Sequence, residues 1–558
     1  MDLRALISCD RLQAHLEHLC TLNRLSGTED DHRATDYVVQ VLEQSGVPVK
    51  VHEFDAYISH PGPATLQVVA PQTFAVPCIT HSLAQPAPEG GLELELVSAG
   101  EGEETDYERL ACSGKAVMFG GYRGLALPEK VKRAEEHGAS AVVCINFSEV
   151  LHEMIVSTVW GTPTLETARE LLRIPVVSIG LAGGEALKRL LEAGPVRAFL
   201  KTEVDTGWWR LRLPVAEISS EVSDDFFLLG GHMDSWYEGA TDNATGDAVL
   251  LELALAFQKS RHELKRGVRV AWWPGHSHGR YAGSAWYADN AWAELDAHCV
   301  GVLIVDSPGV RGASVQRMRT AEESKAYALD ILKRLGQANP SLLRPERVGD
   351  QSFLGIGITS MSLNSELTAG HPDKRPVGGS GGGWWWHSKW DTIDKADAGV
   401  MFVDAVAIGE VVGGAVVGDM LPYRVAGAAA HFLETLKERR GWCAPVVDIS
   451  PAVALCEALV EKAECFDAAV SSGAIAPAKA NDLIKRVTRV LNSVLYTSGD
   501  RFHQDPAVLE EMLPGLAAAK MLSSKSRDKA GFARYQVVKE CNRITDALRR
   551  AAEMLDGS

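Results

Sequence analysis

Several features that would decide a function class are missing from this sequence. It has no run of 18 or more apolar residues, which is about the length that a helix needs to cross a bilayer. None of its ten cysteines stands in a CxxC pair, the spacing of common zinc-finger and redox motifs. Positive charge is not in surplus, because 56 Lys and Arg residues face 73 Asp and Glu, a formal net charge of −17. Nucleic acids and anionic membranes bind basic surfaces, so we expect neither as a partner.

The first twenty residues, MDLRALISCDRLQAHLEHLC, also lack the uninterrupted apolar stretch of a secretory signal. Their charges are scattered, as in an amphipathic helix. Several cysteines lie inside apolar runs, as Cys144 does in SAVVCIN, which is typical of a reduced thiol in a core. Together these observations predict a cytoplasmic protein.

What is present is typical of a folded chain with several domains. Hydrophobic residues make up 46% and charged residues 23% of the 558, a normal globular balance, and this length predicts two to four domains. The texture of the sequence changes near residues 56, 216 and 447. These changes divide the chain into segments 1–55, 56–215, 216–446 and 447–558.

The last three segments predict different architectures. In 216–446, unbroken apolar strands such as FFLLGGH, VRVAWW and GVLIVD alternate with helical segments such as AVLLELALAFQKS. That pattern predicts an α/β fold with a mostly parallel sheet covered by helices on both faces. In 56–215, short strands and Pro/Gly turns predict a β-rich unit, and after 447 three long amphipathic segments predict a helical domain.

Side chains that bind metals follow several of the predicted strands. Ligands in parallel-sheet proteins gather at the carboxyl ends of the strands. His232 and Asp234 end the first strand, and in an extended His-x-Asp the Asp234 carboxylate can accept the second imidazole N–H. Asp242 stands in the loop GATDNATG and could bridge two cations or cap the following helix. Asp306 ends a buried strand and needs a partner, and His387 stands in WWWHSKWDTID.

In this order the motifs GGHMDSW, GATDNATG, the Asp after a strand and WHSKWDTID resemble the two-zinc exopeptidase family of bacterial aminopeptidases, glutamate carboxypeptidase and transferrin receptor. The resemblance covers nearly the whole chain. It implies a zinc-exopeptidase-type catalytic domain from 1–55 and 216–446 and a protease-associated insert at 56–215. It also implies a dimerisation-like helical domain at 447–558, and therefore a homodimer.

The resemblance further implies the roles of the site residues. His232, Asp242 and Asp306 would hold one metal ion, and Asp242, a further acid and His387 would hold a second. Asp234 would lie behind His232. The implied reaction is hydrolysis of a peptide or amide bond in a small substrate by a metal-activated water.

One segment departs from the family pattern, which has two adjacent glutamates after the third strand. Here the segment from Trp273 to Ser284 reads WPGHSHGRYAGS and contains no glutamate. Counting forward from Trp273 places His276 at the position of the general base. Counting back from Ser284 places His278 at the position of the metal ligand. Two interpretations stay open: either His278 binds metal and His276 accepts protons, or activity is lost as in the transferrin receptor.

The histidines change the expected chemistry. Losing a carboxylate makes the site more positive, and imidazole suits transition metals better than magnesium or calcium. We therefore predict one or two divalent transition-metal ions, with zinc as the first choice. Glu366 remains an alternative base. The substrate could also be a non-peptide amide, such as an N-acyl, carbamoyl or cyclic amide, and a non-catalytic binding protein is the third hypothesis.

Overall fold

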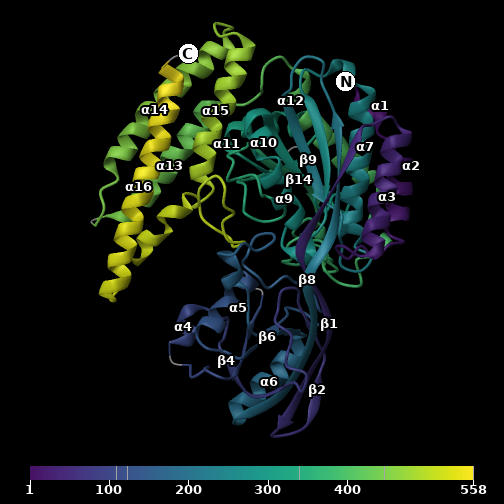
Figure 1. Ribbon diagram of the computed structural model, residues 1–558, viewed down its shortest axis with the longest axis vertical. Coiled ribbons are helices and arrows are strands. Elements are labelled where there is room, and N and C mark those ends of the chain that lie inside the picture. The colour runs from purple at the N-terminus through teal and green to yellow at the C-terminus, as the bar shows by residue number, and fades with distance from the viewer. Residues whose placement is uncertain (109, 122, 338–339, 445, 557–558) are drawn as a thin grey trace.

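The computed structural model describes residues 1–108, 110–121, 123–337, 340–444 and 446–556. Figure 1 shows three parts: a sheet flanked by helices, a β-rich lobe below it, and a group of long helices at one side. Two long strands, β1 Val49–Ala70 and β8 Val196–Ile218, connect the first two parts and belong to one continuous sheet.

The main sheet confirms the predicted mostly parallel α/β fold. Its strands run in the order β13-β12-β14-β11-β9-β10-β8. Strands β9, β10, β11 and β14 are parallel to their neighbours in this group, while β12 is antiparallel to β14 and β8 is antiparallel to β10. The bounds are β8 Val196–Ile218, β9 Phe226–His232, β10 Gly267–Trp273, β11 Cys299–Ile304, β12 Val315–Thr320, β13 Ser341–Leu343 and β14 Ser360–Glu366.

Helices cover both faces of this sheet because its central strands are apolar on both sides. In β9, Phe227 and Leu229 join one core, and Phe226 and Leu228 join the core on the opposite face. The first core also contains α1 Leu3–Leu6, α2 Cys9–Leu19, α3 Glu29–Gln44, α7 Thr245–Lys259, α11 Glu322–Arg334 and α12 Ala398–Val417. The second contains residues of α9 Ala282–Asn290 and α10 Trp292–His298.

Helix α12 is the one helix in the described ranges that is long and apolar enough to cross a membrane by composition. Two thirds of its apolar window is buried inside the protein, where α12 packs against α2, α7 and β14. Its composition is therefore that of a core helix.

The lower lobe is built on two long antiparallel strands. β1 Val49–Ala70 pairs with β8 over almost its full length, and both continue from the main sheet into the lobe. The expected boundaries at 55/56 and 215/216 fall inside these strands. We call residues 71–195, with the lower halves of β1 and β8, the insert lobe. Its further elements are β2 Phe74–Val76, β3 Cys78–Thr80, β4 Leu92–Ser98, α4 Glu104–Tyr107, β5 Ala116–Gly120, α5 Leu127–Glu136, β6 Ala141–Ile145, η1 Thr167–Glu170, β7 Val176–Ile179 and α6 Leu181–Ala193.

The helical region at the side of the molecule (residues 425–556) starts with a helix that the sequence did not single out, α13 Val425–Cys443. It continues with the three predicted ones, α14 Ser450–Ser471, α15 Pro477–Leu495 and α16 Arg527–Asp556, and with the short turn η6 Pro514–Met521. The loop between α15 and η6 runs back towards the insert lobe and the main sheet, where Ala507 N donates to the carbonyl of Thr158 over 2.7 Å. All three parts of the molecule therefore meet near the carboxyl ends of the parallel strands.

Candidate active site

His232 is the last residue of β9, and it is buried at the carboxyl edge of the sheet. Its Nδ1 lies 2.8 Å from the main-chain carbonyl of Asp234, so the proton sits on Nδ1 and leaves the Nε2 lone pair free. We expected the Asp234 carboxylate in this role, and the structure corrects that expectation. Because β9 ends at His232, the chain turns there, and the two side chains do not alternate as in an extended strand.

The Asp234 carboxylate instead holds the next loop of the site. Its Oδ1 accepts the amide of His276 over 2.9 Å, and its Oδ2 accepts the amide of Ser277 over 2.7 Å and the hydroxyl of Ser26 over 3.0 Å. Burial alone would raise the pKa of Asp234, but the contact with His278 and the surrounding imidazoles lower it below its usual value. Asp234 thus fixes the backbone of the histidine segment rather than a ring of the metal group.

Asp242 lies between two imidazoles. Its Oδ1 is 3.0 Å from Nε2 of His232, and its Oδ2 is 3.2 Å from Nε2 of His387. Burial would raise its pKa, but these two rings lower it well below the usual range, so this carboxylate is ionised. The side chain does not cap the helix that follows, α7, which has no side-chain cap. It faces the two rings instead.

The loop that carries Asp242 is held by an acid whose role the sequence did not predict. Asp391 accepts the amide of Thr241 over 3.0 Å and its hydroxyl over 2.7 Å with Oδ1, and the amide of Asp242 over 3.0 Å with Oδ2. Asp391 is buried, and burial raises its pKa to about 7. It stands four residues after His387, inside a motif that the sequence already marked.

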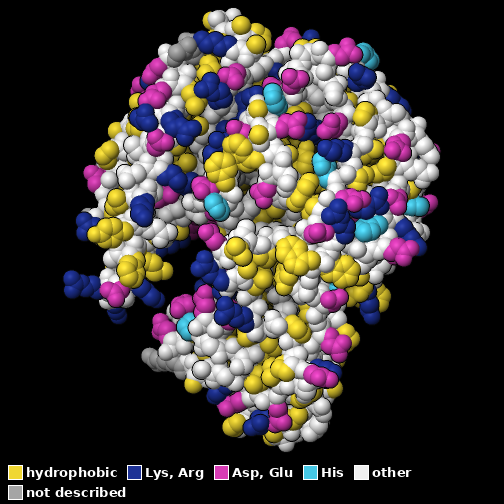
Figure 2. Space-filling view, viewed as in Figure 1, with side chains coloured by type: hydrophobic (Ala, Val, Ile, Leu, Met, Phe, Trp, Pro, Cys, Tyr) yellow, Lys and Arg dark blue, Asp and Glu magenta, His cyan; other side chains and the backbone are white. Residues whose placement is uncertain are grey.

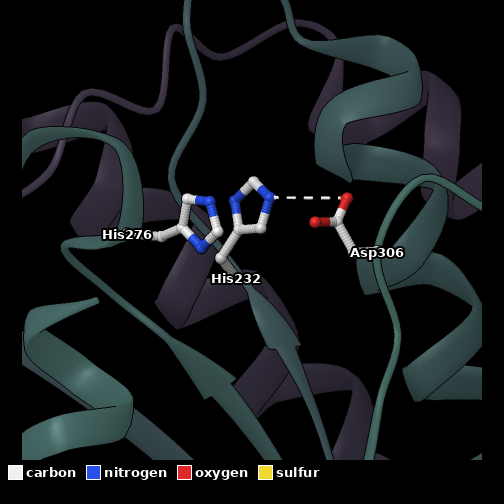
Figure 3. A group of neighbouring side chains, drawn as sticks. All are labelled: His232, His276 and Asp306. Carbon is white, nitrogen blue, oxygen red and sulfur yellow. Dashed lines mark ion pairs between the residues drawn. The ribbon is translucent and has the colours of Figure 1, made fainter. Parts of the chain in front are cut away.

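Asp306 follows β11 and faces the same space. One of its oxygens lies 3.9 Å from Nε2 of His232, and burial together with the charge of Asp242 raises its pKa. Figure 3 shows the rings of His232 and His276 side by side, with His232 directed at Asp306. Ligand atoms of these three residues all lie within 4.8 Å of one another, a separation typical of groups that border a metal site.

His387 reaches the site from the loop before α12. It adopts a positive φ of 53°, and its Nδ1 lies 2.6 Å from the carbonyl of Glu153 in the insert lobe. The indole of Trp386 stacks on its ring at 3.8 Å. That indole lies so close to Gly378 and Gly379 that a Cβ on Gly379 would come within 2.6 Å of its Nε1. The glycines at 378 and 379 therefore leave room for the Trp386 indole to pack against His387, a candidate metal ligand.

The other two indoles of the tryptophan triplet do not border the metal group directly. Trp385 is buried and donates to the hydroxyl of Thr241 over 3.1 Å, and Trp384 donates to Asp373 over 3.1 Å. Of these three indoles, only that of Trp386 lies against a candidate metal ligand.

The segment after β10 forms the short helix α8 His276–Gly279, and it separates its two histidines. The ring of His276 stacks on His232 with 3.9 Å between centroids and 19° between planes. Its Nδ1 lies 2.7 Å from Oδ2 of Asp350, a residue that itself has a positive φ of 55°. His276 therefore carries its proton on Nδ1, and its Nε2 is the free ring nitrogen.

His278 lies behind Asp234 and outside the group of His232, His276 and Asp306. Its Nδ1 is 2.9 Å from the Ser26 hydroxyl and 3.4 Å from Oδ2 of Asp234, and its ring packs on Trp236 at 4.2 Å. The Nε2 atom is buried without a hydrogen bond, and burial lowers the pKa of the ring. The structure thus brings His276, the residue reached by counting forward from Trp273, to the group of His232 and Asp306.

Glu366, the alternative base, is held elsewhere. It forms ion pairs with Arg317 at 2.5 Å and Lys374 at 3.1 Å. Although burial opposes the effect, both cations lower its pKa. Phe353, three residues after Asp350, is fully buried in the core that also contains residues of α9 and α10.

Arg24 was not recognised from the sequence, although it fixes the loop between His232 and Asp242. It is fully buried and donates to the carbonyls of Met233 over 2.9 Å, Glu238 over 3.1 Å and Gly239 over 3.1 Å. A lone arginine in the loop between α2 and α3 carries no motif, so only the fold reveals this role.

The donor set fits a divalent transition-metal ion. Nε2 of His232 is buried and has no hydrogen bond, although Asp242 lies 3.0 Å away. Imidazole nitrogens and carboxylate oxygens are the usual zinc ligands together with cysteine. A buried lone pair beside two carboxylates is satisfied by a cation.

Comparisons with known proteins agree with this geometry. Residues 215–407 match the family described as Peptidase family M28. The chain is 29% identical over 293 residues to the probable lipoprotein aminopeptidase LpqL of Mycobacterium tuberculosis, covering 50% of this chain and 54% of the relative. It is 26% identical over 360 residues to the probable glutamate carboxypeptidase VP8 of Zea mays, covering 53% and 50%. The chain thus spans about half the length of these curated relatives.

Solved structures show the same fold. The aminopeptidase from Aneurinibacillus sp. strain AM-1 superposes with a TM-score of 0.59 and 22% identity, covering 74% of this chain and 95% of that one. A zinc aminopeptidase from Bacillus subtilis gives a TM-score of 0.57 and 22% identity, covering 74% and 96%. At this level of identity the likeness concerns the fold, and the chemistry is argued from the site.

Proposed function

We propose that this chain, whose residues 215–407 match Peptidase family M28, is a metal-dependent hydrolase that cleaves a peptide or amide bond in a small substrate. The observation that carries the proposal is the position of Asp242, whose two oxygens face Nε2 of His232 and Nε2 of His387. A carboxylate shared between two imidazoles at the carboxyl edge of a parallel sheet is suited to bridging two cations.

The metal ligands follow from this arrangement. His232, Asp242 and Asp306 would hold one divalent ion, zinc being the first choice, and Asp242 and His387 would hold a second. The Nε2 of His278 is buried without a hydrogen bond, and we assign His278 to the second ion. When bound, such ions polarise the scissile carbonyl and lower the pKa of a water molecule.

His276 is assigned as the proton acceptor rather than as a ligand. Its lone pair lies in the plane of its ring, and that plane is nearly parallel to the plane of His232 at 3.9 Å. Lone pairs in two parallel planes do not converge on one ion. With its Nδ1 proton bonded to Asp350, His276 can take a proton from the attacking water at Nε2 and deliver it to the leaving amine.

A second candidate function is hydrolysis of a non-peptide amide, such as an N-acyl, carbamoyl or cyclic amide. It is favoured by the histidine segment itself, which presents two imidazoles where the family pattern has two carboxylates. A site with less negative charge favours substrates that carry an anionic group near the scissile bond.

The test is a substrate panel assayed before and after chelation and metal reconstitution. Aminoacyl 4-nitroanilides, dipeptides and N-acyl or N-carbamoyl amino acids separate the two candidates by the product released. We expect turnover that chelator abolishes and zinc restores, and that His232→Ala removes. His262→Ala, which changes an exposed histidine far from the ligands, is the matched control. Absence of turnover with every metal and substrate would favour a non-catalytic binding protein.

We also propose a homodimer formed through the helical region. The exposed residues Phe532, Tyr535 and Val538 recur every three positions on α16, a spacing that places them on one side of the helix. Hydrophobic and basic side chains gather at the projecting lower end of this region in Figure 2. Light scattering should give twice the chain mass, and Tyr535→Glu should shift it to the monomer.

A cytoplasmic location is supported by the cysteines, all ten of which are unpaired. Cell fractionation tests this proposal.

A further inference from the structure

A chain of hydrogen bonds leads from the insert lobe to His276. Trp160 Nε1 donates to the hydroxyl of Ser352 over 2.8 Å, and the hydroxyls of Ser352 and Ser284 lie 2.9 Å apart. Ser284 donates to Oδ1 of Asp350 over 2.7 Å, and Oδ2 of Asp350 lies 2.7 Å from Nδ1 of His276. All five side chains are buried.

The donors Trp160 and Ser284 set the directions of the bonds in this chain. An indole nitrogen only donates, so the Ser352 oxygen accepts from Trp160 and sends its own proton to Ser284. Ser284 donates its one hydroxyl proton to Oδ1 of Asp350, so its oxygen is left to accept from Ser352. The second oxygen of Asp350 then requires a donor, and Nδ1 of His276 is that donor. The chain therefore selects the tautomer of His276 with a free Nε2.

We propose that Trp160 and Asp350 are positioning residues, which hold His276 in the tautomer and orientation that present Nε2 to the group containing Asp306. The catalytic consequence rests on the proposed hydrolase function, whereas the tautomer itself does not. Neither residue reaches the reacting atoms, and both act through the imidazole. The insert lobe would then supply part of the catalytic apparatus across a domain boundary.

Packing around the chain supports this role. The guanidinium of Arg347 lies over the Trp160 ring at 4.5 Å, and Tyr281 packs on the same indole at 4.3 Å. Tyr281 also meets His276 edge to face at 4.8 Å. The Trp160 indole is thus linked to His276 by two routes, one through the hydrogen bonds and one through Tyr281.

The helical region also contacts the segment that carries Asp350 and Ser352. Gln504 Nε2 donates to the carbonyl of Ser352 over 2.9 Å, and Arg347 donates to the carbonyl of Asp505 over 2.7 Å. The loop between α15 and η6 therefore anchors the segment that carries Asp350. This contact gives the C-terminal part of the chain a role in the site, although it lies outside the matched family segment 215–407.

NMR spectroscopy tests the tautomer of His276 directly. Long-range ¹H–¹⁵N spectra of ¹⁵N-histidine-labelled protein report which ring nitrogen is protonated, with His276 assigned from the spectrum of His276→Gln. We expect the Nδ1–H form in the wild type and a mixture of tautomers in Asp350→Asn. Trp160→Phe, which keeps the ring and removes the donor, should shift the His276 signals in the same direction by less. Trp208→Phe, at an indole that is 67% exposed, is the control and should change nothing.

Kinetics then test the coupling. Asp350→Asn should lower kcat by about 10²–10⁴-fold, because a carboxamide no longer fixes the tautomer. Trp160→Phe should lower it about 3–10-fold, and the double variant should be within about twofold of Asp350→Asn alone. Metal content and KM should stay unchanged in all three. Ser352→Ala interrupts the chain without touching either end and replaces Trp160→Phe if that variant does not fold.

The outcomes separate this proposal from the hydrolase proposal. An Nε2–H tautomer in the wild type, or additive losses in the double variant, would overturn it even if the protein cleaves amides. The expected tautomer response in a protein with no turnover would refute the hydrolase and leave the positioning of His276 standing.

Discussion

Asp242 places one carboxylate oxygen 3.0 Å from Nε2 of His232 and the other 3.2 Å from Nε2 of His387. Each imidazole has its Nδ1 bonded to a main-chain carbonyl, that of Asp234 for His232 and that of Glu153 for His387. With Nδ1 bonded in this way, both rings direct Nε2 at the same acid. This symmetry underlies the expectation that the acid is shared between two ions.

Metal content should follow from that sharing. We expect His232→Ala and His387→Ala each to lose the ion on their own side, and Asp242→Asn to lose most of both, because it removes the charge that faces both rings. Elemental analysis after exhaustive dialysis measures the ions per chain. His262→Ala should match the wild type. Full retention of metal in Asp242→Asn would contradict the assignment.

His276→Ala should separate catalysis from metal binding. Because its ring plane runs parallel to that of His232, we assign His276 to proton transfer, and such a group contributes about 10²–10⁴-fold to rate. The variant should lose that factor in kcat and keep its metal. If instead the metal is lost together with activity, His276 is a ligand, in keeping with the 4.8 Å cluster that it forms with His232 and Asp306.

A methyl group on Gly379 should disturb His387 through Trp386. The added Cβ would lie 2.6 Å from the indole Nε1, so the indole must move away from the ring on which it stacks. Displacing such an outer partner weakens metal binding about 10–100-fold. Competition titrations with a zinc indicator measure the change for Gly379→Ala. Gly370→Ala is the matched control, since nothing lies within 4 Å of that position.

Glu153 should make stability depend on pH. It is buried, its Oε2 has no hydrogen bond, and burial raises its pKa to about 7, against about 4.3 in an unfolded chain. As the pH rises from about 4.3 to 7, the unfolded chain releases this proton while the folded protein keeps it, so the free energy of unfolding falls.

Glu153→Gln removes that penalty while its side-chain oxygen can still accept the Tyr237 hydroxyl. Near pH 4 the variant should have the same free energy of unfolding as the wild type. Above pH 7 its free energy of unfolding should be higher by about 3 kcal/mol. Chemical denaturation across this pH range measures the difference, and exposed Glu166→Gln should track the wild type. A constant gap at all pH values would show that the carboxyl is not the cause.

The sequence by itself determined the elements and the chemistry of their ends. Apolar strands followed by His232, Asp242 and Asp306 predict a parallel sheet with metal-binding side chains at one edge, because strand hydrophobicity and strand-end position are local properties of the chain. The helices of the C-terminal region were equally predictable from the sequence, since amphipathic spacing is also a local property.

Only the tertiary structure decided which histidine joins the group. His276 and His278 are two residues apart and equally plausible in sequence. They are distinguished by distant partners: Asp350 lies 74 residues beyond His276, and Ser26 lies 252 residues before His278. The roles of Arg24, Asp391 and Trp160 are equally invisible in sequence, because each depends on packing between segments that are far apart in the chain. Local pattern fixes what a residue can do, and the fold fixes which partner it meets.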